Sequence, residues 1–539
     1  MIAVFLVLLA GVSWKFWSGK TTPEETTSPN SSLFGTMIAF NINEAPMHTP
    51  GIIDTLRKGW TEFRKDDPAY QNLLSNLKKL IQDRTKLVKA TGFSIDRGFN
   101  YFTWNVIEPK KGQFDWELTD IYVKGATNAG VKVSAVVQPF AGWDQKNASP
   151  FANCNAIDFA FYDYKAGPPN DLAEYKIFLT KMVERYKDNV SVWEIGNEYD
   201  SHCGGYENNP QGYFDLLKIS SETIKKADPN AKITNGGAMP IVGMPESDSF
   251  KAFWTKFLAL GGGRYIDYFN VHYNIERSLG AKLDPATFEK DLVAFNNLMD
   301  KNGGRKPLYL TEFGIYSGAP SEPAPMTGGE AQGPGQTQTN LPLQPTQPGQ
   351  SLNQPPSGGK CGDGICDAFE KATPNACPLD CGGSMPSGSP EQSPNQNTQP
   401  NQRKALPKLS ENAQATLYFK DSILAFANGA QVIFIDLIGD DYVVGSSMAF
   451  NTDKQPRLFF ATLKMIDRKI SGFSKIEKIA YGQYKFIVKN KAVYALWSGK
   501  MPAEITGQVT ITHIDGSRVI KDAADVSLST DEPIFVLKD

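Results

Sequence analysis

The segment VSVWEIGNE, residues 190–198, begins as a short apolar run rich in β-branched residues and ends in polar side chains. A run of this kind is typical of a strand in a parallel sheet that is buried on both faces. Seven further runs of similar character follow one another along the chain. They are TMIAFNI (36–42), FSIDRGF (93–99), VKVSAVVQ (131–138), AKITNGG (231–237), IDYFNVHY (266–273), PLYLTEFG (307–314) and QVIFIDLI (431–438).

Helical patterns separate these runs. Apolar residues recur at helical spacing over residues 172–186, with Asn170 or Asp171 in position to cap the helix. The same spacing returns over 459–470, with Pro456 near the helix start. Eight β-α repeats predict an α/β fold, a (β/α)8 TIM barrel, whose active site lies at the C-terminal ends of the strands.

A long insertion interrupts the repeat between the last two runs. Their starts lie 124 residues apart, at 307 and 431, and residues 319–406 account for the excess. Residues 331–360 contain six Pro, seven Gln and a single charge, a composition that cannot bury a core. We therefore expect a disordered, Cys-rich insert after strand 7, with a crosslinked knot at residues 361–381.

The last part of the chain changes character. Short alternating runs follow one another from about residue 472, and Gly482, Ser498-Gly499 and Asp515-Gly516 punctuate them. We interpret this part as a small C-terminal antiparallel β domain. The expected domains are thus barrel strands 1–7 over 33–318, the insert over 319–406, the barrel completion with strand 8 and the last helices over 407–471, and the β domain over 472–539.

The N-terminus resembles an export signal. Ile2 to Val12 is an uninterrupted apolar run that is too short to span a membrane and fits the core of a signal peptide. Counting on to Trp17 gives a signal anchor broken by Lys15, and a buried first helix is the alternative. We predict a signal peptide or signal anchor over 1–20 and a polar linker over 21–32, hence an extracellular or cell-surface protein, with membrane anchoring if the segment is not cleaved.

Composition excludes some classes of function. The chain has 55 Lys plus Arg against 58 Asp plus Glu, a formal net charge of -3, which argues against a nucleic-acid binder. Its four histidines show no metal-ligand spacing, and no Walker A or dinucleotide-type glycine motif is present. We therefore expect neither a metal nor another cofactor.

The six cysteines are an even number, which in an exported chain indicates disulfides. Cys154 and Cys203 follow the third and fourth runs and could pair, with free thiols or a metal bound with His202 as alternatives. The others cluster in the knot with a spacing that lacks the C-x2-C pairs of zinc ribbons, so two disulfides are favoured. They are Cys361, Cys366, Cys377 and Cys381.

Two glutamates are the candidate catalytic residues. Glu198 follows the fourth run and Glu312 lies near the end of the seventh, so a barrel would carry both to its open face. Two carboxylates that face one pocket are what glycoside hydrolysis needs, because one protonates the leaving oxygen while the other attacks the anomeric carbon or activates water. Glu194 lies inside the fourth run, and we expect it to form a structural ion pair.

With these residues, the barrel resembles the clan A glycoside hydrolases, the 4/7 superfamily, and within it family 39 or cellulase family 5. Asn197 and Glu198 match the family's Asn-Glu pair after strand 4, which implies that Glu198 is the acid/base and that Asn197 binds the sugar's 2-hydroxyl. Glu312 matches the nucleophile after strand 7. The segment IDRGFNYFTWNVIEPKKGQFDWELTD (95–120) resembles the strand-2 region, where an arginine matching Arg97 braces the nucleophile.

His272-Tyr273 resembles the family's His/Tyr element near the nucleophile, although many members place the tyrosine two residues after the histidine. The family's tryptophan at the end of strand 8 has no counterpart in QVIFIDLIGDDY. Trp104, Trp143 and Tyr316 follow strands 2, 3 and 7, where each could stack on a sugar or pack in the core or at the rim.

The resemblance implies an exported retaining β-glycosidase that acts on oligo- or polysaccharides and needs no cofactor. Two alternatives remain open: a carbohydrate-binding or adhesion protein on a catalytically inactive barrel, and a transglycosylase that uses the same residues. The sequence does not indicate the sugar, endo or exo action, or the oligomeric state.

Overall fold

The computed structural model describes residues 32–37, 68–145, 168–200, 206–238, 248–274, 284–315, 409–436, 449 and 456–538. The chain divides into two compact units, one formed by Met1–Pro323 with Leu406–Asp539 and the other by Ala324–Ala405. The second unit, the N-terminal 31 residues and all six cysteines lie outside the described residues. The export signal, the knot and the disulfides therefore stay predictions.

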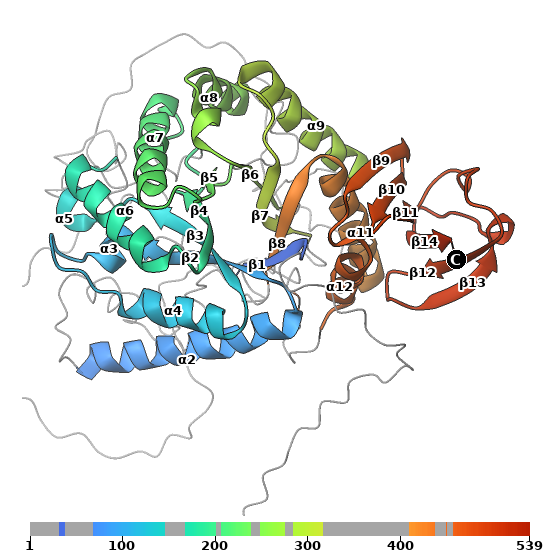
Figure 1. Cartoon of the computed structure of the whole chain (residues 1–539), viewed down its shortest axis with the longest axis horizontal. Coiled ribbons are helices and arrows are strands. Elements are labelled where there is room, and N and C mark those ends of the chain that lie inside the picture. Colours follow the sequence, from blue (N-terminus) through green and yellow to red (C-terminus); the bar gives the residue numbers. More distant parts are fainter. Residues whose placement is uncertain are drawn as a thin grey trace, which may run out of the picture. The chain divides into compact units, whose positions relative to one another are not determined.

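Eight parallel strands form the sheet of the larger unit, as the sequence predicts (Figure 1). Their order is β5-β4-β3-β2-β1-β8-β7-β6, and the bridges Thr234–Tyr268 and Ala238–Val271 join β5 to β6, so that the sheet closes into a barrel. The strands are β1 (Phe34–Met37), β2 (Ile95–Thr103), β3 (Lys132–Gln138), β4 (Val190–Ile195), β5 (Ile233–Asn235), β6 (Phe269–Asn274), β7 (Leu308–Gly314) and β8 (Ala430–Asp436).

Helices alternate with the strands. The helix predicted over 172–186 begins at Leu172 because the Asp171 side chain accepts hydrogen bonds from two backbone N–H groups of its first turn. Gly261 has a left-handed φ of 92° and its N–H bonds to the Leu258 carbonyl, so it ends α8. The helices are α2 (Pro68–Thr91), α3 (Trp104–Ile107), α4 (Glu117–Asn128), α5 (Gly142–Gln145), α6 (Leu172–Tyr186), α7 (Pro210–Ala227), α8 (Asp248–Ala259), α9 (Pro285–Asn302), α11 (Glu411–Ala427) and α12 (Leu458–Ile470), with a 3-10 helix, η5 (Gly262–Tyr265), after α8.

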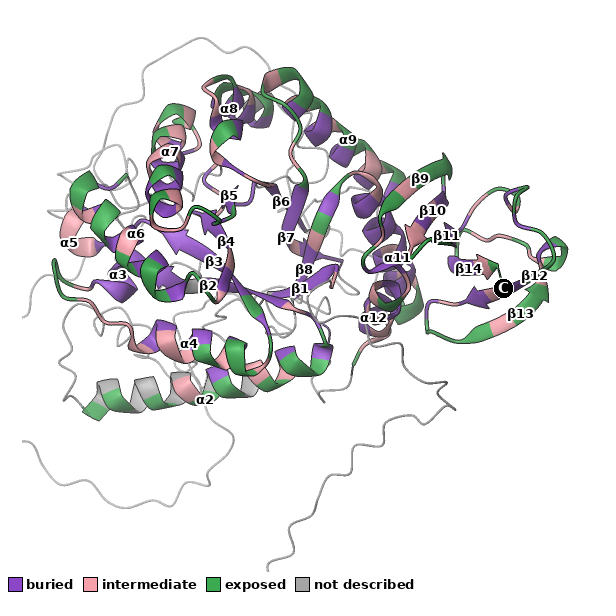
Figure 2. Ribbon diagram, viewed as in Figure 1, coloured by how far each residue is buried: buried purple, intermediate pink, exposed green. Residues whose placement is uncertain are grey.

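The barrel strands are buried almost throughout, whereas the surrounding helices other than α11 are exposed along their outer faces (Figure 2). Inside the barrel, Ile95, Val192, Tyr309 and Phe434 form a separate apolar cluster. These side chains fill the barrel, so the polar residues further along the same strands lie on a rigid base. None of the helices in the described part of the chain is both long and apolar enough to cross a bilayer.

The predicted C-terminal β domain is a six-stranded antiparallel sheet of order β13-β12-β14-β11-β10-β9. It packs on the barrel's last helices: Phe419 of α11 lies 5.0 Å from Phe535 between ring centroids, and the Thr462 hydroxyl of α12 donates to the Ile514 carbonyl. The strands are β9 (Lys475–Ala480), β10 (Gln483–Val488), β11 (Lys491–Leu496), β12 (Gln508–Thr512), β13 (Arg518–Asp522) and β14 (Ile534–Lys538).

Candidate active site

Polar side chains from four strands meet at one end of the barrel. Arg97 lies on β2, Asn197 and Glu198 follow β4, His272 lies on β6 and Glu312 lies on β7. The β6–β7 pairing shifts register here, since Val271 pairs with Leu310 but His272 pairs with Glu312. Such an irregularity re-aims side chains.

Arg97 forms hydrogen bonds to three other polar side chains of the site. Its guanidinium is fully buried and donates to the Glu194 carboxylate through Nε at 2.9 Å and Nη2 at 2.7 Å. Nη1 donates to Glu312 Oε1 at 2.9 Å, and Nη2 also donates to Asn197 Oδ1 at 2.7 Å. Burial alone would lower the Arg97 pKa, but the Glu194 and Glu312 carboxylates outweigh it and raise the pKa. The ion pair expected for Glu194 is confirmed.

Glu198 and Glu312 are the accessible acids of this cluster. Their side chains are 20% and 17% exposed, whereas those of Arg97 and Glu194 are fully buried. One carboxylate oxygen of each glutamate and one ring nitrogen of His272 all lie within 4.8 Å of one another. A ligand that enters from solvent can therefore contact both carboxylates, while the charges beneath them stay fixed.

His272 lies between the two carboxylates. Its Nδ1 is 2.9 Å from Glu198 Oε1 and 3.5 Å from Glu312 Oε2. The Thr311 hydroxyl donates to Asn270 Oδ1, so its oxygen is free to accept from His272 Nε2–H at 3.0 Å. We therefore assign a proton to Nε2, which leaves Nδ1 to share a proton with Glu198. Burial would lower the His272 pKa, but the Glu312 and Glu198 carboxylates outweigh it and raise the pKa.

The backbone around Glu198 is specialised. Glu198 itself has a φ of 49°, a region that non-glycine residues seldom adopt and that recurs at functional sites. Its N–H bonds to the Gly237 carbonyl at 3.2 Å. A Cβ atom on Gly237 would lie 1.9 Å from His272 Nε2, so only glycine fits there.

Two residues proposed from sequence do not reach this cluster. Tyr273 is buried on the other side of β6 from His272, where its hydroxyl donates to Asp291 of α9 at 2.9 Å and its ring packs edge-on against Phe288. Trp104 is fully buried, stacks on Phe178 and donates to Glu108 at 2.7 Å. Trp104 is thus a core residue, and neither side chain offers a surface to a sugar.

Of the other two aromatic candidates, Trp143 lies within the described residues and Tyr316 does not. Trp143 on α5 is partly exposed, and its indole N–H donates to the Glu108 carbonyl at 2.8 Å. It packs edge-on against Trp104 at 5.1 Å between ring centroids. Trp143 therefore keeps a rim position from which stacking on a sugar remains a prediction. Tyr316 lies outside the described residues.

Sequence reasoning missed three residues that support the site: Asn270, Thr311 and Gly237. Asn270 and Thr311 orient His272, and each is a buried polar residue within a barrel strand. A buried polar residue must find a hydrogen-bond partner, so a polar residue within a strand was the available signal. The pair Gly236-Gly237 at the end of a strand was a second signal, since it indicates close backbone approach.

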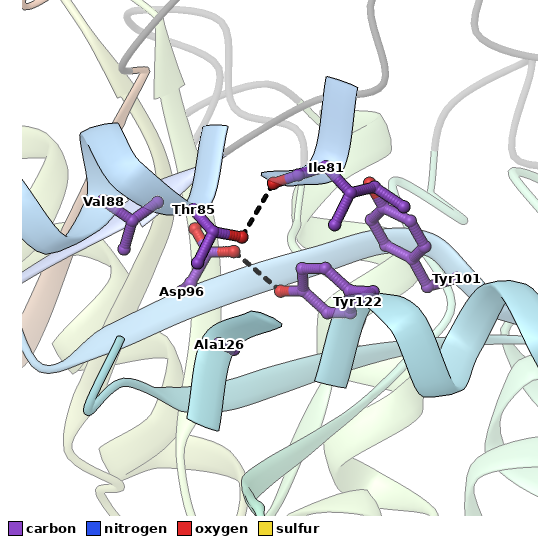
Figure 3. A pocket seen from close by; sticks show the side chains of 7 residues that line it. All are labelled: Ile81, Thr85, Val88, Asp96, Tyr101, Tyr122 and Ala126. Atoms are coloured by element: carbon purple, nitrogen blue, oxygen red, sulfur yellow. Dashed lines mark hydrogen bonds between the residues drawn. The ribbon is translucent and has the colours of Figure 1, made fainter. Parts of the chain in front are cut away.

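Glu198, His272 and Glu312 are spaced closely enough to surround a metal ion. The hydrogen bond of His272 to Glu198 and its 3.5 Å ion-pair contact with Glu312 account for the same geometry without a metal. A cavity elsewhere, between α2, β2 and α4, is lined by Asp96 and Tyr122 among others and has a volume of only about 10 Å³ (Figure 3). It is far too small for a sugar, so the strand-end cluster is the candidate site.

No family model matches this chain. A β-galactosidase, LacZ, from Lactobacillus acidophilus is 27% identical over 136 residues, which are 23% of this chain and 20% of that protein. The chain thus spans about a fifth of the length of the curated relative that it matches.

Among solved structures, a GH39 β-xylosidase from Caulobacter crescentus superposes with a TM-score of 0.48 at 9% identity, covering 95% of this chain and 97% of that one. The GH39 enzyme from Xanthomonas axonopodis pv. citri gives 0.47 at 10% identity, covering 94% of each chain. A glucosidase from Croceicoccus marinus gives 0.45 at 11% identity, covering 84% and 91%.

Proposed function

We propose that this chain is a retaining β-glycosidase that hydrolyses O-glycosidic bonds by double displacement. The observation that carries the proposal is the spacing of Glu198 and Glu312, since one carboxylate oxygen of each lies within 4.8 Å of one of the other. Retaining glycosidases hold their two carboxyl groups about 5–5.5 Å apart, whereas inverting enzymes separate them by about 6.5–9.5 Å to admit a water molecule. The spacing supports direct attack by one carboxylate.

In the first step Glu312 is the nucleophile. Arg97 holds Glu312 Oε1, which leaves Oε2 to attack the anomeric carbon. Glu198 gives its proton to the departing glycosidic oxygen as the bond to the anomeric carbon breaks. The products of this step are the free aglycone alcohol and an ester between the sugar and Glu312.

In the second step Glu198, now a carboxylate, removes a proton from a water molecule that attacks the anomeric carbon. The ester bond breaks, Glu312 returns to its carboxylate form, and the sugar leaves with its original anomeric configuration. His272 Nδ1 hydrogen-bonds to the Glu198 carboxyl group before the first step and again after Glu198 has taken the proton of the water molecule. Asn197, whose carbonyl oxygen is held by Arg97, presents its amide N–H to the sugar's 2-hydroxyl.

We further propose that the enzyme is exported and acts on oligo- or polysaccharides outside the cell. The apolar run at Ile2–Val12 and the even number of cysteines support export. Fractionation of cells that express the full chain, followed by N-terminal sequencing of the mature protein, tests this proposal. An intracellular enzyme with an intact Met1 would contradict it.

The reaction is tested by proton NMR of the first-formed product from aryl β-galactosides, β-xylosides and β-glucosides. Retention predicts that the β-anomer forms first and then equilibrates. Trapping with the matching 2-fluoro glycoside should add one sugar mass to the peptide that contains Glu312. An α-anomer formed first would show inversion, binding without turnover would favour a carbohydrate-binding protein, and transfer products would favour a transglycosylase.

A further inference from the structure

Glu194 holds the deepest charge of the site. It lies on β4, is fully buried and binds Arg97 through both carboxylate oxygens, at 2.9 and 2.7 Å. The Gly237 N–H also approaches Glu194 Oε1 at 3.3 Å. With both oxygens committed to Arg97 beneath the accessible carboxylates, Glu194 has no route to a substrate.

The same guanidinium contacts the proposed nucleophile. Arg97 Nη1 donates to Glu312 Oε1 at 2.9 Å, so the nucleophile borders an arginine that already has a full anionic partner. The Arg97–Glu194 pair has no net charge. Glu312 therefore receives a directed hydrogen bond from Arg97, while Glu194 reduces the electrostatic attraction between the two. An unpaired cation would attract Glu312 strongly, because the local dielectric constant is low.

An unpaired arginine would harm this reaction. A carboxylate stabilised by a whole buried positive charge is a weaker nucleophile, because its electron pair is held more tightly in the ground state. A nucleophile without any bracing donor would be mobile and badly aimed. The arrangement of Glu194 and Arg97 avoids both outcomes.

We propose that Glu194 is a positioning residue that aims Arg97 at Glu312 and Asn197 and neutralises its charge, so that the nucleophile is braced but stays reactive. This inference rests on the proposed glycosidase function. It assigns to a fully buried acid a role in setting the nucleophile's reactivity, beyond stabilising the barrel.

Other charged and titratable groups also face these carboxylates in the described part of the chain. Glu312 faces Arg97 of β2, Glu198 after β4 and His272 of β6. Glu194 also lies near the phenols of Tyr213 of α7 and Tyr309 of β7, whose pKa values burial raises. A Glu194 variant leaves all of these groups in place and changes only the charge beside Arg97.

The test is the pH dependence of kcat/KM for an aryl glycoside, whose acid limb reports ionisation of the nucleophile in the free enzyme. In Glu194→Gln the charge of Arg97 acts on Glu312 alone, so we expect the acid limb to move to lower pH by about one unit or more. kcat should fall about tenfold or more as the nucleophile weakens. Glu194→Asp keeps the charge but shortens the reach, so activity should fall with the acid limb unmoved.

Glu108→Gln is the matched control, because Glu108 is equally buried at the same end of the barrel but bonds to Trp104 and the Gly112 N–H. It should leave the acid limb in place. If Glu194→Gln does not fold, the double variant Arg97→Met/Glu194→Met replaces the neutral pair with apolar side chains. We expect it to have low activity and an acid limb at higher pH, because Glu312 loses its hydrogen bond from Arg97 and gains apolar neighbours.

Two outcomes would overturn the inference: an unmoved acid limb in folded Glu194→Gln, or an unmoved acid limb in the double variant. Both would leave Glu194 with a purely structural role. Failure of the proposed function looks different, since the wild-type protein would then hydrolyse none of the glycosides.

Discussion

His272 Nδ1 lies 2.9 Å from Glu198 Oε1, and the opposite ring nitrogen bonds to Thr311. His272 therefore connects Glu198 to Thr311 through its two ring nitrogens. Burial would lower the pKa of His272, but the Glu312 and Glu198 carboxylates outweigh it and raise the pKa. The ring thus keeps its second proton to a higher pH than a free imidazole does, and it can pass that proton to Glu198 until pH rises through the pKa of His272.

Replacement of His272 should make the enzyme lose activity at a lower alkaline pH than the wild type does. His272→Gln removes the imidazole whose pKa the neighbouring carboxylates raise, so we expect the basic limb of kcat/KM to move to lower pH by about one unit. His513→Gln, on the turn between β12 and β13, is the control and should leave the profile unchanged. A basic limb that stays in place in folded His272→Gln would show that the histidine does not share the proton.

The two glutamates should respond differently to the leaving group. Glu312→Gln should lose activity on every substrate, because no carboxylate remains to attack. Glu198→Gln should lose about 10²- to 10⁴-fold on substrates with poor leaving groups but much less on activated aryl glycosides, which need little protonation. Circular dichroism should show that both variants are folded. The reverse pattern would exchange the two roles.

From the sequence, a residue of this site can be predicted when its position depends only on which end of a parallel strand it lies at. Glu198 and Glu312 come together because the C-terminal ends of barrel strands meet at one face. Tyr273 was wrongly placed because neighbouring residues of a strand point to opposite faces, so a residue adjacent to an inward His272 points outward. Glu312 lies opposite His272 because the pairing of β6 with β7 shifts by one residue. This register depends on both strands together, so it cannot be read from the sequence of either strand alone.

Asp421 on α11 should make stability depend on pH. Its side chain is 1% exposed, and Oδ1 has no hydrogen-bond partner within the described part of the chain. Burial raises the Asp421 pKa well above its usual value, which Lys420 partly offsets and Asp284 reinforces. A raised pKa means that stability is complete below the unfolded-state pKa, about 3.9, and is lost as pH rises toward the folded-state value.

Asp421→Asn removes this penalty. We expect urea unfolding at pH 8 to show the variant more stable than wild type by about 1 kcal/mol or more, with the gain absent near pH 4. Asp267→Asn is a control of opposite sign, because the pKa of Asp267 is lowered: burial would raise it, but the Ile233 N–H and Lys225 outweigh that effect. It should destabilise at pH 8 and less at low pH. Equal changes at both pH values would contradict the assignment for Asp421.

Cys154 and Cys203 should form a disulfide. They follow β3 and β4, which are neighbours in the barrel, so the sequence places both in adjacent loops. Closing a loop of about 49 residues would stabilise the fold by roughly 4 kcal/mol in the chain-entropy model. Alkylation of the unreduced protein and peptide mapping check this, with the reduced protein as control. Labelled Cys154 in the unreduced sample would refute the pairing.

The insert after β7 should be dispensable for folding and for chemistry on small substrates. Residues 324–405 belong to a different unit from β7, which ends at Gly314, and from α11, which begins at Glu411. A segment outside the unit that forms the barrel should add little to the barrel's stability. Replacing residues 325–403 with a short Gly/Ser loop should therefore preserve the melting temperature and the kcat/KM for aryl glycosides. Retention on an insoluble polysaccharide should fall if the knot holds the enzyme on a polymer. The full chain, prepared in parallel, is the control. If only the deletion variant fails to fold, the insert is integral to the barrel.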